Sequence, residues 1–230
     1  MQVTHYKSIY YIYIKQIKMK YILYTLIFVF SVNINSQTKL YVHPDGDNYA
    51  ANTETIALLP LKVQVKLRPK QLKDFTPDQV VQMSKDEALD IQKGMHSWFL
   101  TRKKRGSLKS SIQTPMKTNA LLKKAGVDIH SASDLLPSEL GEILGVDCVV
   151  MGTFETSKPM SDAAGIAVAA LFGSMMSTNN AVCNLDFYDT RDDELVVNYL
   201  KKISGSLGTD SQDLINILMR KVTRRIPYTK

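Results

Sequence analysis

The side chains that most often do chemistry are few in this chain and lie far apart. Beyond residue 36 the histidines are His43, His96 and His130, and none has the H-x-x-x-H or Cys-pair spacing of a metal site. Each is therefore interpreted as a surface or half-buried polar residue. We predict no metal and no cofactor.

Motifs for nucleophilic and phosphate chemistry are also missing. The sequence holds no G-x-S-x-G elbow and no Gly-rich phosphate loop. Asp192, Asp193 and Glu194 form a carboxylate cluster, but in a hairpin loop they should be solvated, whereas catalysis needs carboxylates with shifted pKa values. No catalytic residue is predicted. A hydrolase whose site converges from distant positions remains an alternative.

Two cysteines, Cys148 and Cys183, allow two interpretations. They can form a disulfide in an oxidising compartment, or they can be buried thiols that act as small apolar residues. Neighbouring strands seldom have disulfide geometry, which favours the thiols. Neither cysteine directly follows the leader, so no lipid anchor is expected.

Residues 19–36 have the layout of a secretory signal peptide. A lysine precedes an apolar stretch over 21–30, and the segment ends at Ser36, after which cleavage is expected. The apolar stretch has about ten residues, whereas a spanning helix needs roughly twenty. A retained membrane anchor is the alternative. Since a proper signal follows Met19, that residue is the expected start.

The positive charge of the chain belongs largely to this leader. Residues 1–36 contain four lysines and no acid, so 25 of the 29 basic residues and all 22 acids remain, which lowers the net charge from +7 to about +3. A nucleic-acid surface needs a basic face or stripe. We therefore expect no nucleic-acid partner.

The region 135–155 predicts a helix, a tight turn and a central strand. Pro137 and Ser138 fit a helix start, with Ser138 as the cap, and Gly145 fits its left-handed end. Cys148 to Met151 is an apolar run without polar alternation, which indicates a strand buried on both faces.

The rest of the chain predicts further helices and strands around this unit. Residues 37–54 are expected to be irregular, with an edge strand at 40–42. The other expected elements are a strand over 55–66 kinked at Pro60, a helix over 77–104 with Gly94 as its weak point, a strand over 108–113, a helix over 117–125 with Ala120, Leu121 and Leu122 inward, and a hairpin over 181–201. A last helix is expected from Asp210 or Ser211, with Leu214, Ile215, Leu218, Met219 and Val222 inward.

Arg102 to Arg105 end the long helix with four consecutive cations. Cations are expected at a helix C-terminus because of its dipole. A contact with phosphate or anionic lipid is the alternative.

The segment 158–180 is an apolar insertion. Gly165, Ala169 and Gly173 stand four residues apart, a small-residue face that allows close helix contact. Three interpretations remain open: packing on its own domain, self-association, and peripheral membrane contact. The residues expected to take part in interaction or oligomerisation are Gly165, Ala169, Leu171, Phe172, Gly173, Met175 and Met176.

These elements predict a single α/β domain over 55–228, with a mixed sheet of about five strands and helices on both faces. Four segments match a known set: Ile56–Leu61 ending in L-P, Gly145–Gly152 (G-V-D-x-V-V-x-G), Tyr188–Val196 (Y-D-T-R-D-D-E-L-V) and Arg225–Tyr228 (R-I-P-Y). Together they resemble the envelope α/β module of the TolB amino-terminal domain, the LpoB-type activators of penicillin-binding proteins and the CsgG-type curli secretion proteins.

The resemblance implies a module that binds partners and does not catalyse. The chain departs from the pattern in lacking a lipidation cysteine and in having Asp193 where Gly is common. CsgG-type proteins form pores from membrane-inserted hairpins, but residues 163–172 do not alternate as lipid-facing strands do.

We therefore expect an exported, non-enzymatic protein of the periplasm or outer membrane that binds other envelope proteins. An oligomeric secretion or pore-associated component that assembles through residues 163–176 is the alternative, with a homo-oligomer as its consequence.

Overall fold

The computed structural model describes residues 38–67, 69–156, 180–204 and 211–229. The signal peptide, the apolar segment 158–179 and the linker 205–209 lie outside these residues, so their predictions stand as predictions. Within the described residues, no helix is long and apolar enough to cross a bilayer.

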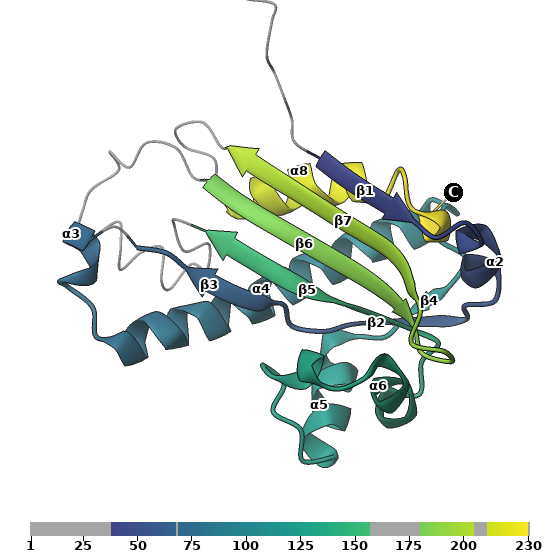
Figure 1. The fold of residues 1–230 in the computed structure, drawn as a ribbon, viewed down its shortest axis with the longest axis horizontal. Coiled ribbons are helices and arrows are strands. Elements are labelled where there is room, and N and C mark those ends of the chain that lie inside the picture. Colours follow the sequence, from purple (N-terminus) through teal and green to yellow (C-terminus); the bar gives the residue numbers. More distant parts are fainter. Residues whose placement is uncertain (1–37, 68, 157–179, 205–210, 230) are drawn as a thin grey trace, which may run out of the picture. The chain divides into compact units, whose positions relative to one another are not determined.

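The described strands form one mixed sheet of seven, more than the five expected (Figure 1). Their order is β1-β7-β6-β5-β2-β4, and β3 pairs with β5 beyond the end of β2. The strands are β1 (Thr38–Val42), β2 (Thr55–Leu58), β3 (Lys62–Val65), β4 (Ser111–Ile112), β5 (Cys148–Thr156), β6 (Asn180–Asp189) and β7 (Leu195–Ser204).

Sequence patterns described some of these regions poorly. The edge strand expected at 40–42 is confirmed as β1, which pairs with β7 at the edge of the sheet, but the rest of 37–54, expected to be irregular, also contains the helix α2 (Gly46–Ala51). The strand expected over 55–66 is two strands, because Leu59, Pro60 and Leu61 stand opposite only two residues of β5. The kink predicted at Pro60 is therefore present, as a one-residue bulge. The strand expected over 108–113 is only the two residues of β4.

The central position predicted for the strand at Cys148 is confirmed. β5 lies between β2 and β6, and Cys148, Val149 and Val150 are fully buried. Cys148 and Val150 belong to one apolar core, whereas Val149 and Met151 belong to a second core on the opposite face. A strand with alternate residues in two cores needs apolar side chains at every position.

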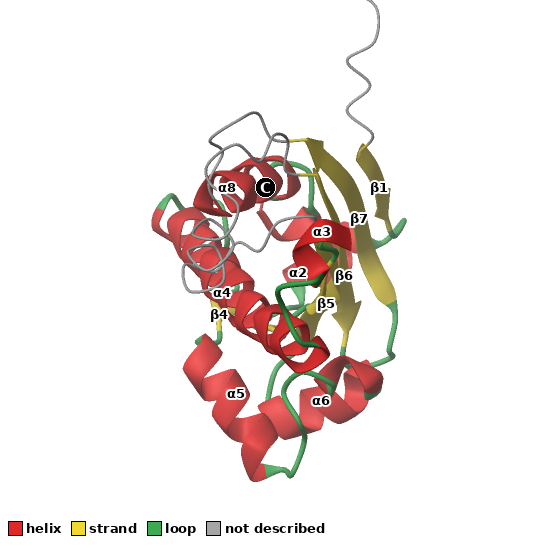
Figure 2. Ribbon diagram, turned by 90° about the vertical axis from the view of Figure 1, so that its left-hand side faces the viewer, coloured by secondary structure: helices red, strands yellow, loops and turns green. Residues whose placement is uncertain are grey.

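Helices cover the two faces of the sheet unequally (Figure 2). The large core lies between the sheet and the helices α4 (Pro77–Lys104) and α8 (Ser211–Val222). The smaller core joins β2 and β5 to α5 (Pro115–Lys124) and α6 (Pro137–Leu144). Helices therefore do lie on both faces, but on the second face α6 reaches only the end of β6, and no described helix covers that face over β7 and β1.

The long helix α4 has the predicted bounds and a capping box. The Gln79 N–H donates to Thr76 Oγ1 at 3.3 Å, and the Thr76 N–H donates to Gln79 Oε1 at 2.8 Å. Gly94, expected to weaken this helix, is a close-packing position instead, because an added Cβ would lie 2.8 Å from Ile215 Cδ1 of α8. Ile215, Leu218, Met219 and Val222 are buried, as predicted for the last helix.

Two expectations about the shorter helices are wrong. Ala120 of α5 is exposed, because that helix buries Thr118 and Leu122. Ser138 does not cap α6 with its own side chain; Glu139 Oε2 accepts from the Leu136 N–H at 2.8 Å. The predicted end of α6 is correct, since Gly145 has φ +64° in the left-handed region.

The two cysteines are free and buried in the large core, which corrects the disulfide alternative. Cys148 lies opposite Asp189 and Cys183 opposite Phe154, six residues further along β5. At about 3.3 Å per residue, that offset separates them by roughly 20 Å, far beyond disulfide reach. Burial raises the pKa of each thiol to about 12, so both remain protonated at neutral pH.

We predict that Gly152→Ala is severely destabilising. Gly152 of β5 has φ +151°, and an added Cβ would lie 2.0 Å from the backbone oxygen of Asn184 on β6. Because that oxygen belongs to a central strand, relief requires parting the sheet, and a loss of about 3 kcal/mol or more in unfolding free energy is expected. Urea denaturation measures it.

Gly126→Ala is the matched control, since Gly126 also has a positive φ, +76°, but has no atom within 4 Å of the added Cβ. It should cost only about 1 kcal/mol of backbone strain. Equal losses in the two variants would contradict the close approach at Gly152.

Candidate functional site

The hairpin loop after β6 joins separate parts of the fold through its carboxylates, which are exposed or half-buried, as expected of a hairpin loop. Asp192 Oδ2 accepts from the Tyr49 hydroxyl of α2 at 2.8 Å, and this hydrogen bond raises the pKa of Tyr49 to about 12. Glu194 Oε1 lies 3.8 Å from His43 Nε2. These two carboxylates thus hold the β1–α2 segment against the loop.

Asp193 occupies the start of α6. Its carboxylate accepts from the Ser138 N–H at 2.6 Å and from the Ser138 hydroxyl at 3.1 Å. A carboxylate at a helix N-terminus satisfies a free N–H and interacts favourably with the helix dipole. Asp193 also has φ +61°, which explains why Gly suits this position and why Asp is tolerated.

The histidines do not form a site with one another. His43 is half-buried, with Nδ1 accepting from the Asp45 N–H at 3.1 Å. His96 and His130 are also half-buried, and burial lowers the pKa of each. Among the residues that the structure describes, no three His, Cys, Asp or Glu side chains gather as a metal site would require.

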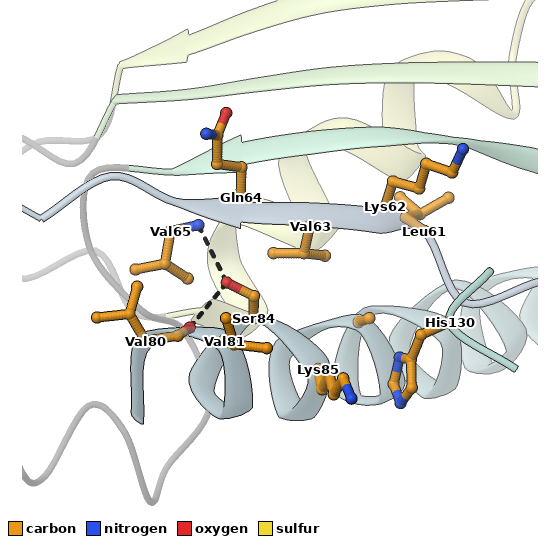
Figure 3. Close-up of a pocket in the computed structure, with 11 residues that line it drawn as sticks. Leu61, Lys62, Val63, Gln64, Val65, Val80, Val81, Ser84, Lys85 and His130 are labelled. Atoms are coloured by element: carbon orange, nitrogen blue, oxygen red, sulfur yellow. Dashed lines mark hydrogen bonds between the residues drawn. The ribbon is translucent and has the colours of Figure 1, made fainter. Parts of the chain in front are cut away.

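The described surface has a groove of about 470 Å³ between β3 and α4, which we call the edge groove (Figure 3). Val63 and Val65 of β3 point toward the helix, whereas Gln64 points away from it. The helix contributes Val80, Val81, Ser84, Lys85 and Ala88, and His130 lies at one end. The floor and walls are therefore mainly aliphatic.

One side of the edge groove is a sheet edge that no described strand covers. In the described sheet, β3 pairs only with β5. The Lys66 N–H donates to Thr156 O of β5 at 2.8 Å, so by alternation the N–H and C=O groups of Val63 and Val65 face away from β5. A strand edge of this kind can pair with another extended chain.

One of these edge groups, the N–H of Val65, makes a long hydrogen bond to a side chain of α4. The Val65 N–H donates to Ser84 Oγ at 3.4 Å, and the Ser84 hydroxyl itself donates to Val80 O at 3.0 Å (Figure 3). At 3.4 Å the first bond is weak. An incoming backbone carbonyl can replace Ser84 as the acceptor at little cost.

Charges lie at the rim of the edge groove. Lys62 forms an ion pair with Asp134, and Lys66 forms one with Glu155 at 2.6 Å. The lowered pKa of His130 leaves that imidazole largely neutral at pH 7. The groove thus offers aliphatic contact and backbone hydrogen bonds, with little net charge.

A second groove, of about 520 Å³, lies between α4 and α5. Gln92 and Asn119 exchange reciprocal side-chain hydrogen bonds of 3.1 and 3.0 Å at this place, and Gln92 also donates to Leu58 O at 2.7 Å. The serine hydroxyl of each groove, Ser84 or Ser97, donates to a carbonyl one turn earlier in α4, so neither serine donates to a base.

Sequence reasoning did not find the edge groove. The residues expected to mediate interaction, Gly165, Ala169, Leu171, Phe172, Gly173, Met175 and Met176, lie outside the described residues. One signal was present in the sequence: Val81 is apolar, yet it is not on the face of α4 that buries Met83, Ala88 and Ile91, and it is 54% exposed. A single exposed apolar residue is ordinary on a protein surface. Val81 gains interest only from its place in the wall of the edge groove, which the sequence does not show.

No family model matches the chain, and no curated protein matches it. Solved structures with some likeness include lipoprotein GNA1162 from Neisseria meningitidis, at 12% identity and TM-score 0.43 over 75% of this chain and 96% of that one. A PelC dodecamer from Paraburkholderia phytofirmans has 10% identity and a TM-score of 0.41, over 84% of this chain and 99% of that one. The LpoB C-terminal domain from Salmonella enterica has 4% identity and a TM-score of 0.30, over 70% of this chain and 95% of that one. With TM-scores below 0.5, this likeness identifies neither a family nor a function.

We predict that Asp193→Ala lowers the free energy of unfolding by about 2 kcal/mol. About half of that loss comes from removing the cap of α6 and half from placing Ala at a positive φ. Asp193→Gly should lose only the cap, about 1 kcal/mol. Urea denaturation of both variants measures the difference.

Asp193→Asn is the control, because its amide oxygen still accepts from Ser138 and Asn tolerates the left-handed region. It should stay within about 0.5 kcal/mol of the native protein. A loss as large as that of Asp193→Ala would show that Asp193 is not a cap.

Proposed function

We propose that this chain is an exported, non-enzymatic protein-binding module of the cell envelope, and that it binds an extended segment of a partner protein along β3. The free edge of β3 beside the aliphatic edge groove carries this proposal. Main-chain hydrogen bonds to a sheet edge give affinity, and a pocket for alternate side chains gives selectivity.

The edge groove has the right composition for such a segment. An added strand would exchange hydrogen bonds with Val63 and Val65, and every second side chain would point toward α4. Val80 and Val81 would meet those side chains. We therefore propose a ligand segment that alternates apolar and polar residues over about five positions.

The exported location rests on the leader pattern of residues 19–36, which has the charge, the apolar stretch and the small terminal residue of a signal peptide. An exported partner is therefore proposed as well. The proposal makes no use of residues 163–176, whose part in assembly stays a separate prediction.

We predict that Val81→Glu abolishes peptide binding without unfolding the protein. A random dodecapeptide library is selected on the native protein, and the selected peptides are assayed against variants by fluorescence anisotropy. Because Val81 is 54% exposed, the variant should keep its melting temperature, while a charge at the groove wall should weaken binding at least tenfold.

Leu100→Glu is the matched control, since Leu100 is an apolar residue of the same helix, is 46% exposed and lies outside the edge groove. It should bind as the native protein does. In the complex, amide exchange at Val63 should slow. Selected peptides that bind both variants equally, or that leave the Val63 amide unprotected, would refute binding along β3.

A further inference from the structure

The described domain buries a lysine that has no acidic partner. Lys201 of β7 is only 3% exposed, and its side chain lies on the same face as Val197 and Tyr199, toward the large core. Its register partners are Thr38 on β1 and Cys183 on β6, neither of which is an acid. Lysine is almost never buried without a counter-ion.

The neighbouring charges make this burial more costly. Lys221, Arg220 and Arg225 lie close enough to Lys201 to disfavour its charged form electrostatically. Among the residues whose side chains the structure describes, none of these four cations forms an ion pair. Two ammonium groups in contact repel each other unless one loses its proton or an anion lies between them.

The helix dipole explains only part of the cluster. Arg220 and Lys221 occupy the last turn of α8, where cations are expected. Lys201 belongs to a strand and gains nothing from being at a helix end, yet it is the most buried of the four. Interaction with the dipole of α8 therefore does not explain why Lys201 is buried here.

We propose that Lys201 and Lys221, with Arg220 and Arg225 beside them, bind the phosphate group of a ligand. A phosphate group carries one negative charge as a diester and close to two as a monoester or free phosphate. Its acceptor oxygens can bridge two ammonium groups and still accept from guanidinium groups. This site is independent of the edge groove, because it is built on β7 and α8 and shares no residue with it.

The titration of Lys201 supports the cluster. Burial, followed by contact with Lys221, lowers the pKa of Lys201 to about 8. Because its pKa in the unfolded chain is near 10.5, the unfolded state binds more protons between pH 8 and 10.5. Without phosphate, the native protein should therefore gain stability relative to Lys201→Met as the pH rises through this window. Bound phosphate should raise the pKa and remove that gain.

The test measures thermal unfolding of the purified protein in inorganic phosphate, with sodium chloride holding the ionic strength constant. Lys201→Met keeps an apolar stem in the buried site and removes the charge. Lys202→Met is the matched control, because Lys202 is the next residue, is exposed and points to the opposite face. The native protein and Lys202→Met should show a saturable rise in melting temperature, and Lys201→Met should show an apparent phosphate affinity at least tenfold lower.

A second arm distinguishes the source of the phosphate group. Sedimentation with phosphatidylglycerol vesicles, compared with phosphatidylcholine vesicles, should retain the native protein and Lys202→Met but not Lys201→Met if a lipid headgroup is the ligand. Stabilisation by inorganic phosphate without sedimentation assigns a soluble phosphate ligand.

A second variant, Lys221→Gln, tests the site in case Lys201→Met does not fold. Lys221 is only half-buried, so its replacement should leave the fold intact and weaken phosphate binding at least threefold. If the native protein shows neither phosphate stabilisation nor vesicle binding, or if Lys201→Met responds as the native protein does, the proposal is wrong.

Discussion

The fold depends on burying one strand on both of its faces. β5 places Cys148 and Val150 in the large core and Val149 in the small one, and all three are fully buried. At about 25 cal/mol per Å² of apolar surface, such a strand stabilises both layers at once. Gly152 then allows β6 to approach so closely that no side chain fits between the strands. β2, β3 and β6 pair directly with β5, and β4, β7 and β1 extend the sheet from β2 and β6.

The hairpin loop after β6 links the ends of these layers. The Thr190 hydroxyl donates to Val146 O at 2.7 Å, and the Thr190 N–H donates to Asp147 O at 3.0 Å, which holds the loop against the start of β5. Asp193 caps α6, and Asp192 holds Tyr49 of α2. A group of three acids that resembles a reactive cluster in sequence is thus used to fasten helices. Carboxylates suit this task because free N–H and O–H donors are what the ends of helices and loops expose.

The two proposed binding sites lie where the fold leaves a requirement unmet. β3 leaves the edge groups of Val63 and Val65 without a neighbouring strand, and Val81 remains exposed beside them. At the other site, burial and like charge act together on Lys201 and Lys221. Unpaired strand edges and unpaired buried charges are both costly, so a partner that satisfies them binds with a gain in free energy. The first site suits an extended peptide and the second a phosphate group.

The sequence by itself determined the elements whose signals are local. The capped start of α4, the left-handed Gly145 and the apolar run at Cys148 each depend on neighbouring residues, and each was predicted correctly. Only the tertiary structure decided the pairing of β1, the two-residue length of β4 and the roles of Asp193 and Lys201, because those depend on contacts between residues far apart in the chain. Side-chain type marks a residue as polar or charged, but the atoms that surround it in the fold decide whether it caps a helix, binds a ligand or remains solvated.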